Sequence, residues 1–288
     1  MKAKAYMYII AGAALWGLIG LFVKTLTLQG FTSMQIVALR SISSSICITL
    51  ILAKIKPAAL KIHWRDSWMF IGTGILSLTF FNYCYFKCID CSSLAVAALL
   101  LYTAPIFVML LSLVLFQEKF TLVKGISMIA TFIGCGLVTE ALTGQLNLSF
   151  SGLLFGLGSG IGYALYSIFG KFALRKYDTY TITAFTFYFS MLSSVPLADL
   201  SASPDICSFS TLINVLGLCL FSTILPYLLY TAGLNGVEAG KASILATIEP
   251  FVAASVGIAV FGEALTWPKA LGMLLIFAAI ALLNKSKS

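Results

Sequence analysis

A carboxylate and a proline stand side by side in the otherwise apolar stretch SILATIEPFVAASVG, residues 243–257. Glu249 is the only charged residue there, and Pro250 follows it directly. A carboxyl group in such surroundings can bind a cationic group or a proton, or it can pair with a neighbouring group and serve only stability. Arg40, inside another apolar run, is the candidate ion-pair partner. We keep both hypotheses and prefer binding, because the adjacent proline can open the helix beside the carboxylate.

Other polar and aromatic side chains within the apolar runs could line a cavity with Glu249. The candidates are Trp16, Arg40, Asn82, Tyr83, Tyr85, Tyr102, Tyr163, Tyr166, Tyr227 and Tyr230. Tyrosines at the ends of membrane helices commonly serve as interface anchors, but Tyr102, Tyr163 and Tyr227 lie well inside their runs. An aromatic lining with few charges favours flat, amphipathic or cationic solutes over sugar phosphates.

Two prolines, Pro105 and Pro250, are expected to kink the helices that contain them. Proline lacks a backbone N–H and clashes with the preceding turn, so the carbonyl groups of Leu101 and Ala246 should be freed. Such carbonyls can bind solute or ion beside a cavity. The alternative is a kink that only shapes the packing of helices.

No group of residues supplies the usual machinery of an enzyme. The stretch NGVEAGKAS, residues 235–243, resembles a phosphate-binding loop but lacks its first glycine and its final serine or threonine. Cys84, Cys88 and Cys91 have a C-x3-C-x2-C spacing, for which small packing residues are the better interpretation. The single histidine, His63, lies in a basic loop. We therefore expect no catalytic residue, no metal and no cofactor, and we keep an intramembrane enzyme only as an alternative.

The elements that must position these residues are long apolar runs. The 288 residues are 60% hydrophobic and only 10% charged, whereas a soluble domain has about 25% charged residues. A membrane-spanning helix needs about 20 apolar residues. Ten runs of this kind predict an all-α integral membrane protein with ten transmembrane helices, at 5–24, 32–53, 67–86, 92–116, 121–140, 151–173, 179–199, 210–232, 239–261 and 266–284.

The net charge of +8 does not indicate nucleic-acid binding, because the charges are distributed as the positive-inside rule requires. With the N-terminus inside, only Lys24, Lys87 and Lys269 fall on the outer side. We therefore predict a multi-pass protein of the plasma membrane with both termini in the cytoplasm. The residues predicted on the inner side are Lys2, Lys4, Lys54, Lys56, Lys61, Arg65, Lys119, Lys124, Lys171, Arg175, Lys176, Lys241, Lys285 and Lys287.

The chain repeats itself with an offset of 145 residues. Pro105 then aligns with Pro250 and Glu118 with Glu263, and, at a slightly different offset, Lys24 aligns with Lys171. Each half holds five spans, residues 5–140 and 151–284. Since five is odd, the halves should have inverted orientations, as in many secondary transporters. We expect the two glutamates to cap the helices that follow them.

These residues resemble the ten-helix EamA branch of the drug/metabolite transporter superfamily. The resemblance covers nearly the whole chain and depends on the corners FQEKFT (116–121) and FGEALT (261–266), on Arg40 and on the pair Trp16-Gly17. It implies a basket of two inverted five-helix halves, with a cavity walled chiefly by spans 1, 3, 4, 6, 8 and 9. It also implies export or exchange of small organic solutes such as amino acids.

We predict that the protein is a secondary transporter of small organic metabolites, amino-acid-like, aromatic or cationic, that works by alternating access and most readily as an exporter. An uptake permease is the alternative within transport. The expected partners are the solute, the lipid bilayer and, if transport is coupled, protons. Nucleic acid is not among them, and a homodimer is one option for the oligomeric state.

The charge distribution gives a first test. Reporter fusions at Lys61 and Lys176 should report the cytoplasm, and fusions at Ser149 and Ala202 the outer side, because basic loops are retained inside. An outward position for Lys61 would contradict both the topology and the inverted repeat.

Overall fold

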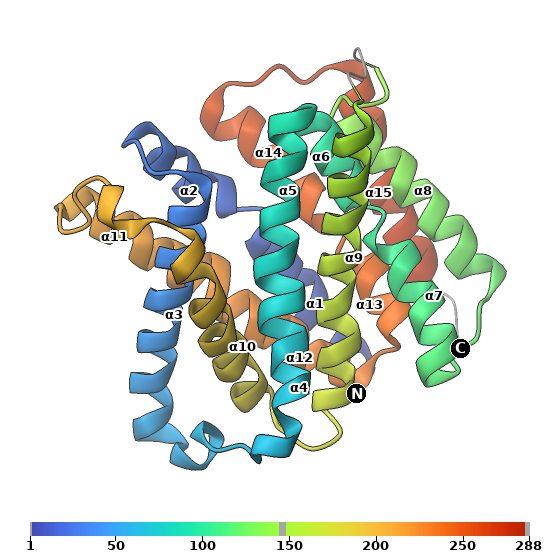
Figure 1. Cartoon of the computed structure of the whole chain (residues 1–288). Helices are drawn as coiled ribbons and strands as arrows, with labels where there is room; N and C mark the ends of the chain where they lie inside the picture. The colour runs from blue at the N-terminus through green and yellow to red at the C-terminus, as the bar shows by residue number, and fades with distance from the viewer. Residues whose placement is uncertain (1, 144–147, 286–288) are drawn as a thin grey trace.

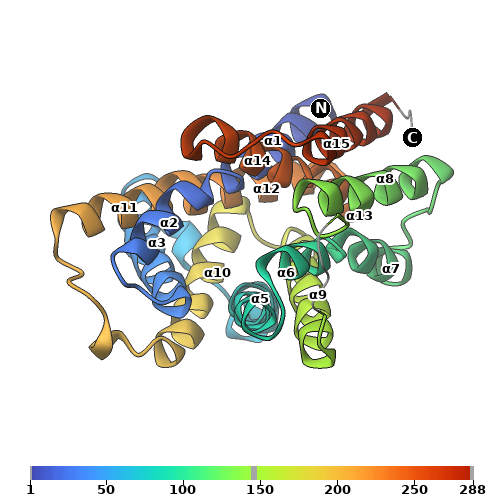
Figure 2. The same ribbon diagram turned by 90° about the horizontal axis from the view of Figure 1, so that it is seen from above.

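The computed structural model describes residues 2–143 and 148–285 of the chain, and every regular element within them is helical. The helices lie side by side around a common centre (Figures 1 and 2). Eight helical stretches in the described residues are long and apolar enough to cross a membrane: Ala3–Leu28, Ser33–Ile55, Trp64–Cys91, Leu94–Phe116, Phe150–Ala173, Phe209–Gly236, Ala239–Phe261 and Trp267–Asn284. The all-helical membrane architecture is therefore confirmed.

Two of the predicted spans contain shorter helices. Helix α8 (Leu122–Val138) is apolar but has only 17 residues, and α10 (Thr179–Ser194) has 16. The number of ten crossings thus remains a prediction. Short 3₁₀ helices occupy connections at Pro57–Leu60, Trp64–Asp66, Val195–Leu197 and Leu200–Ala202.

Three of the long stretches are interrupted near their middles. The first consists of α1 (Lys2–Trp16) and α2 (Ile19–Leu28), the second of α6 (Leu94–Leu101) and α7 (Ala104–Phe116), and the third of α13 (Ala239–Leu245) and α14 (Ile248–Phe261). The last two breaks end two residues before Pro105 and three residues before Pro250. Discontinuous helices near the middle of a membrane are common around transporter binding sites.

The backbone at the second and third breaks is tightened rather than left open. The N–H and hydroxyl groups of Thr103 donate to the Leu100 carbonyl at 3.1 and 2.6 Å, and those of Thr247 donate to the Ile244 carbonyl at the same two distances. The expectation that Pro250 frees the Ala246 carbonyl is wrong, since the N–H of Glu249 donates to it at 3.0 Å.

Two other stretches widen into π-helix. The segment Ile71–Thr79 separates α4 (Ser67–Phe70) from α5 (Phe80–Cys91), and Leu220–Ile224 separates α11 (Phe209–Cys219) from α12 (Leu225–Gly236). The 145-residue offset places these π-helical segments at overlapping positions of the two halves. Such segments often mark functional sites, because the wider turn changes the direction of side chains and frees polar groups.

Helices α8 and α15 (Trp267–Lys285) pack with their backbones almost in contact. A Cβ atom on Gly272 would come within 2.6 Å of the Gly134 carbonyl oxygen, and a Cβ on Gly134 within 2.9 Å of the Gly272 carbonyl oxygen. Further along, the Ser127 hydroxyl donates to the Ala279 carbonyl at 3.2 Å. The other main pairs are α1 with α12, α5 with α9 (Phe150–Ala173), and α3 (Ser33–Ile55) with α10.

The connections divide between the two ends of the bundle. The lower end in Figure 1 carries the connections 56–66, 117–121, 174–178 and 237–238, with the start of α1 and the end of α15. There Asp66 accepts from Lys176 Nζ at 2.6 Å and from the Tyr177 hydroxyl at 2.8 Å. The predicted inner residues Lys56, Lys61 and Arg65 therefore share this end, while Lys287 lies outside the described residues.

The predicted capping role of Glu118 and Glu263 is wrong. The hydroxyl of Thr121 accepts from the N–H of Lys124 at 3.3 Å, and that of Thr266 from the N–H of Lys269 at 3.4 Å. The shorter threonine side chain, one residue before each helix, reaches these N–H groups directly.

The close contact of α8 and α15 predicts a difference between two glycines. Gly272→Ala should lower the temperature of unfolding of the purified protein, because the new Cβ meets a backbone oxygen that cannot move aside. Gly20→Ala in α2, whose Cβ would meet nothing within 4 Å, should leave it unchanged or raise it slightly. Equal stability of the two variants would contradict the described contact.

Candidate functional site

Aromatic side chains from three helices meet at the centre of the bundle. The ring of Trp16, at the end of α1, lies 6.2 Å from the ring of Tyr163 on α9. It lies 5.0 and 5.2 Å from the rings of Tyr227 and Tyr230 on α12. Tyr166, one turn after Tyr163, packs edge-on against Tyr227 at 5.0 Å. Five of the eleven candidate cavity residues, namely Trp16, Tyr163, Tyr166, Tyr227 and Tyr230, form one cluster.

The rings surround a small pocket, which leaves about 10 Å³ for the centre of a water molecule. Two hydrogen bonds between hydroxyl groups lie around it: Tyr230 with Ser167 at 2.7 Å, and Tyr166 with Thr231 at 2.6 Å. The residues that line the pocket are Trp16, Ser77, Phe81, Tyr163, Tyr166, Ser167, Tyr227 and Tyr230. A pocket of this size holds about one water, so a larger solute requires the rings to separate.

The indole N–H of Trp16 lacks a hydrogen-bond partner among the described residues. Trp16 is 7% exposed, and a buried donor without an acceptor costs about 1–3 kcal/mol. Native proteins rarely leave such a group unpaired unless a water, an ion or a ligand completes it. The donor belongs to a residue that lines the pocket, so an acceptor atom of a bound molecule would satisfy it.

Glu249 lies beside this aromatic cluster in the first turn of α14. Its Oε2 accepts from the Tyr163 hydroxyl at 2.9 Å, and the start of a helix favours a negative charge. The break between α1 and α2 brings the backbone close: a Cβ on Gly17 would come within 2.8 Å of the Glu249 carbonyl oxygen. In the pair Trp16-Gly17, the first residue therefore lines the pocket and the second lets α14 approach closely.

Arg40 occupies a different position from the one expected for an ion-pair partner. Its Nε donates to the Thr223 hydroxyl at 2.8 Å, inside the second π-helical segment. Its guanidinium lies 5.8 Å from the centre of the Tyr227 ring, where a cation–π interaction is favourable. Within the described residues no ion pair joins Arg40 to Glu249, so the hypothesis of a direct pair between them is wrong.

The remaining candidates are not among the residues that line the pocket. The amide of Asn82 donates to the Leu78 carbonyl of its own helix at 2.7 Å. Tyr85 packs beside the buried residues Cys88 and Val96, and Tyr102 lies half-buried at the break between α6 and α7. Tyr83 is exposed on the outside of the bundle.

Three pocket residues were not predicted, Ser77, Phe81 and Ser167, and neither was Thr231, the hydrogen-bond partner of Tyr166. Ser167 follows Tyr163 by one helical turn, and Thr231 follows Tyr230, which are weak signals. Hydroxyl residues are common in membrane helices, where they also bond to their own backbone. Ser77 lines the pocket from within the π-helical segment, which no pattern in the sequence predicts.

Comparison with known proteins gives a consistent result. The model of the EamA-like transporter family matches residues 3–140 and again residues 150–285. An uncharacterized transporter of Archaeoglobus fulgidus is 34% identical over 213 residues, which covers 72% of this chain and 74% of the relative. The uncharacterized transporter YxxF of Bacillus subtilis is 24% identical, covering 98% of this chain and 89% of the relative. One solved crystal structure superposes with a TM-score of 0.83 at 17% identity, covering 98% of this chain and 96% of that one, which shows the fold alone.

The central position of Tyr227 predicts a stability test. Tyr227→Ala should destabilise the protein by about 3–5 kcal/mol, the usual cost of removing a buried aromatic ring, because the ring contacts Trp16, Tyr166 and Phe187 at 5.0–5.2 Å. Tyr227→Phe keeps the ring and should unfold near the wild-type temperature. An equal loss in both variants, measured by thermal unfolding, would assign the stability to the hydroxyl instead.

Proposed function

We propose, since the chain belongs to the EamA-like transporter family, that it moves small organic solutes across the plasma membrane by alternating access, in the direction of export. The central aromatic pocket with Glu249 at its edge is the observation that carries the proposal. A carboxylate, six aromatic side chains and an indole N–H without a partner among the described residues meet there. Family and relatives point to a transporter rather than an enzyme.

The proposed architecture is ten crossings in two inverted repeats, residues 5–140 and 151–284. The same family model matches both halves. The 145-residue offset carries Ser127 to Gly272 and Gly134 to Ala279, so it exchanges the two contacts between α8 and α15, Ser127 with Ala279 and Gly134 with Gly272. An antiparallel pair whose contacts map onto one another in this way supports a two-fold axis between the halves.

The chemistry of the pocket favours an amino-acid-like, aromatic or cationic solute. Glu249 would bind an ammonium or another cationic group, and the N–H of Trp16 an oxygen acceptor. The rings of Tyr163, Tyr227 and Tyr230 would pack against an apolar or aromatic body. Arg40, which contacts Thr223 and Tyr227, supplies positive charge beside the Tyr227 ring.

Glu249 can also hold a proton when the solute is absent. A cationic solute would then displace that proton, which couples its movement to a proton moving the other way. Uptake of a similar solute is the alternative direction, because the same pocket can work either way with the gradients reversed.

The test uses Glu249→Gln, which keeps the size of the side chain and removes its charge. A thermal-shift screen of amino acids and aromatic amines first selects a bound solute, and its flux is then measured in liposomes at two pH values. We expect transport to fall by about tenfold or more, the effect of losing a hydrogen bond to a charged group, and to lose its dependence on pH.

The control is Asp90→Asn, an exposed carboxylate that pairs only with Lys87 in the described structure, at 3.6 Å. It should transport like the wild type. Normal flux in Glu249→Gln at both pH values would show that the carboxylate does not take part in transport. A lowered unfolding temperature together with normal flux per folded molecule would support a purely structural role.

A further inference from the structure

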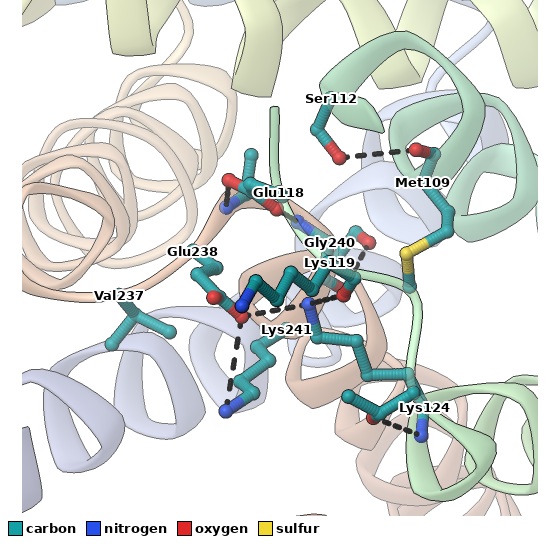
Figure 3. A network of polar contacts seen from close by, with 12 residues as sticks. Met109, Ser112, Glu118, Lys119, Lys124, Val237, Glu238, Gly240 and Lys241 are labelled. Carbon is teal, nitrogen blue, oxygen red and sulfur yellow. Dashed lines mark hydrogen bonds and ion pairs between the residues drawn. The ribbon is translucent and has the colours of Figure 1, made fainter. Parts of the chain in front are cut away.

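The lower end of the molecule is closed by a carboxylate that crosses between the two halves. Glu118, just after α7, accepts from the backbone N–H of Ala239 at 2.6 Å and from that of Gly240 at 3.1 Å (Figure 3). These are the first two residues of α13, whose N–H groups have no partner within the helix. Glu118 is only 9% exposed, so this bridge is buried and charge-assisted.

A second buried contact strengthens the same closure. Lys124, which is 1% exposed, pairs with Glu238 at 2.7 Å and donates to the Lys119 carbonyl at 2.6 Å (Figure 3). Beside it, Lys171 at the lower end of α9 donates to the Leu234 and Val237 carbonyls at 2.9 and 2.6 Å. The connections 117–121 and 237–238, one from each half, are thus held together.

The upper end has the matching sequence positions, but in the part of the chain that the structure describes they do not form the bridge. The 145-residue offset places Glu263 where Glu118 stands, and Leu94 and Ala95 where Ala239 and Gly240 stand. The Glu263 side chain is 49% exposed and contacts Lys269 at 3.2 Å. Leu94 is 62% exposed, whereas Ala239 is completely buried.

Two further pairs show the same asymmetry. Val108 on α7 is buried, while its counterpart Ala253 on α14 is exposed. Lys24, the counterpart of Lys171, lies over the ring of Phe261 at 3.8 Å, whereas Lys171 bonds to backbone carbonyls. Paired positions would have equal burial if both ends had one conformation, so the two ends differ, and the lower end is the more tightly closed by buried contacts.

A cavity on the lower face is lined by residues of both connections. It has a volume of about 630 Å³ and is lined by Glu118, Lys119, Lys171, Arg175 and Glu238, among others. Lys171 lies one turn below Ser167, which belongs to the central pocket. The bridge of Glu118 to α13 therefore stands at the entrance from the lower face to the pocket.

We propose that Glu118 and Glu263 are alternating latches. Glu118 closes the lower end by binding the start of α13, as described here. In the opposite conformation Glu118 releases α13, and Glu263 closes the upper end by binding the N–H groups of Leu94 and Ala95 at the start of α6. This inference rests on the proposed alternating access, and it assigns the positioning residues that hold each conformation.

The test measures the width of the upper end without any solute. Spin labels are placed on the native, exposed Cys91 beside α6 and on an introduced Ala264→Cys beside α14, with Cys207→Ser to remove the other exposed cysteine. Double electron–electron resonance then gives the ratio of long to short distances. Without a latch substitution, the labelled protein should show mainly the long distance between the two labels, which corresponds to a wide upper end.

The two latch variants should act in opposite directions. Glu118→Ala should shift the ratio toward the short distance by about tenfold or more, because two hydrogen bonds to a charged group are lost only in the lower-closed conformation. Glu263→Ala should remove the short-distance population. Glu140→Ala, which removes another upper-end carboxylate near Lys269, should leave the ratio unchanged.

Equal shifts in both latch variants, or no shift in either, would overturn the proposal, since a purely structural role predicts only lower stability. If Glu118→Ala does not fold, Glu118→Gln, which keeps an acceptor but loses the charge, should give a smaller shift in the same direction. The distances require no transport, so failure to find a solute would count against the proposed function and not against the latches. Solute flux in liposomes, found without opposite shifts of the label distances in the two latch variants, would count against the latches and not against the proposed function.

Discussion

Every backbone N–H and carbonyl group inside a lipid bilayer must find its partner within the protein. This constraint decides where the helices of this chain can be interrupted. The breaks at residues 102–103 and 246–247 are closed by threonine hydroxyls that bond to the carbonyl three residues earlier. The break at 17–18 is covered by α14, which comes so close that residue 17 has no room for a side chain. Of these three breaks in the described residues, two are closed by the chain's own hydroxyls and the third is covered by another helix.

The same constraint explains what the sequence could predict. Apolar runs of about 20 residues, enough to cross a membrane as a helix, predicted most of the helices. They could do so because composition alone decides whether a segment can lie in lipid. Pro105 and Pro250 indicated breaks, because proline acts on its own turn. The sequence did not predict that threonine hydroxyls would hydrogen-bond to the backbone at these breaks. The Ala246 carbonyl was expected to be free, but it accepts a hydrogen bond from the N–H of Glu249.

Contacts between distant helices were beyond the sequence. Glu118 was expected to cap its own next helix, but it binds the start of a helix about 120 residues later, since the fold brings that helix within reach. Arg40 and Glu249 each lie inside an apolar run, but this placement says nothing about which helices are neighbours. In the structure each has a different partner, Thr223 for the arginine and Tyr163 for the carboxylate. The aromatic residues were better candidates, because large rings deep in several helices tend to meet at the centre.

The indole N–H of Trp16 has a consequence for discrimination between solutes. A site made only of apolar and aromatic surface distinguishes molecules weakly, since one methylene changes binding by about 1–3 kcal/mol. A buried donor that is satisfied only when the solute brings an oxygen acts differently. Two solutes of equal size and shape would be separated by whether they carry that atom, because the one that lacks it leaves the donor unpaired in the loaded pocket as well. Selectivity would then depend less on the volume of the cavity than on a single atom of its cargo.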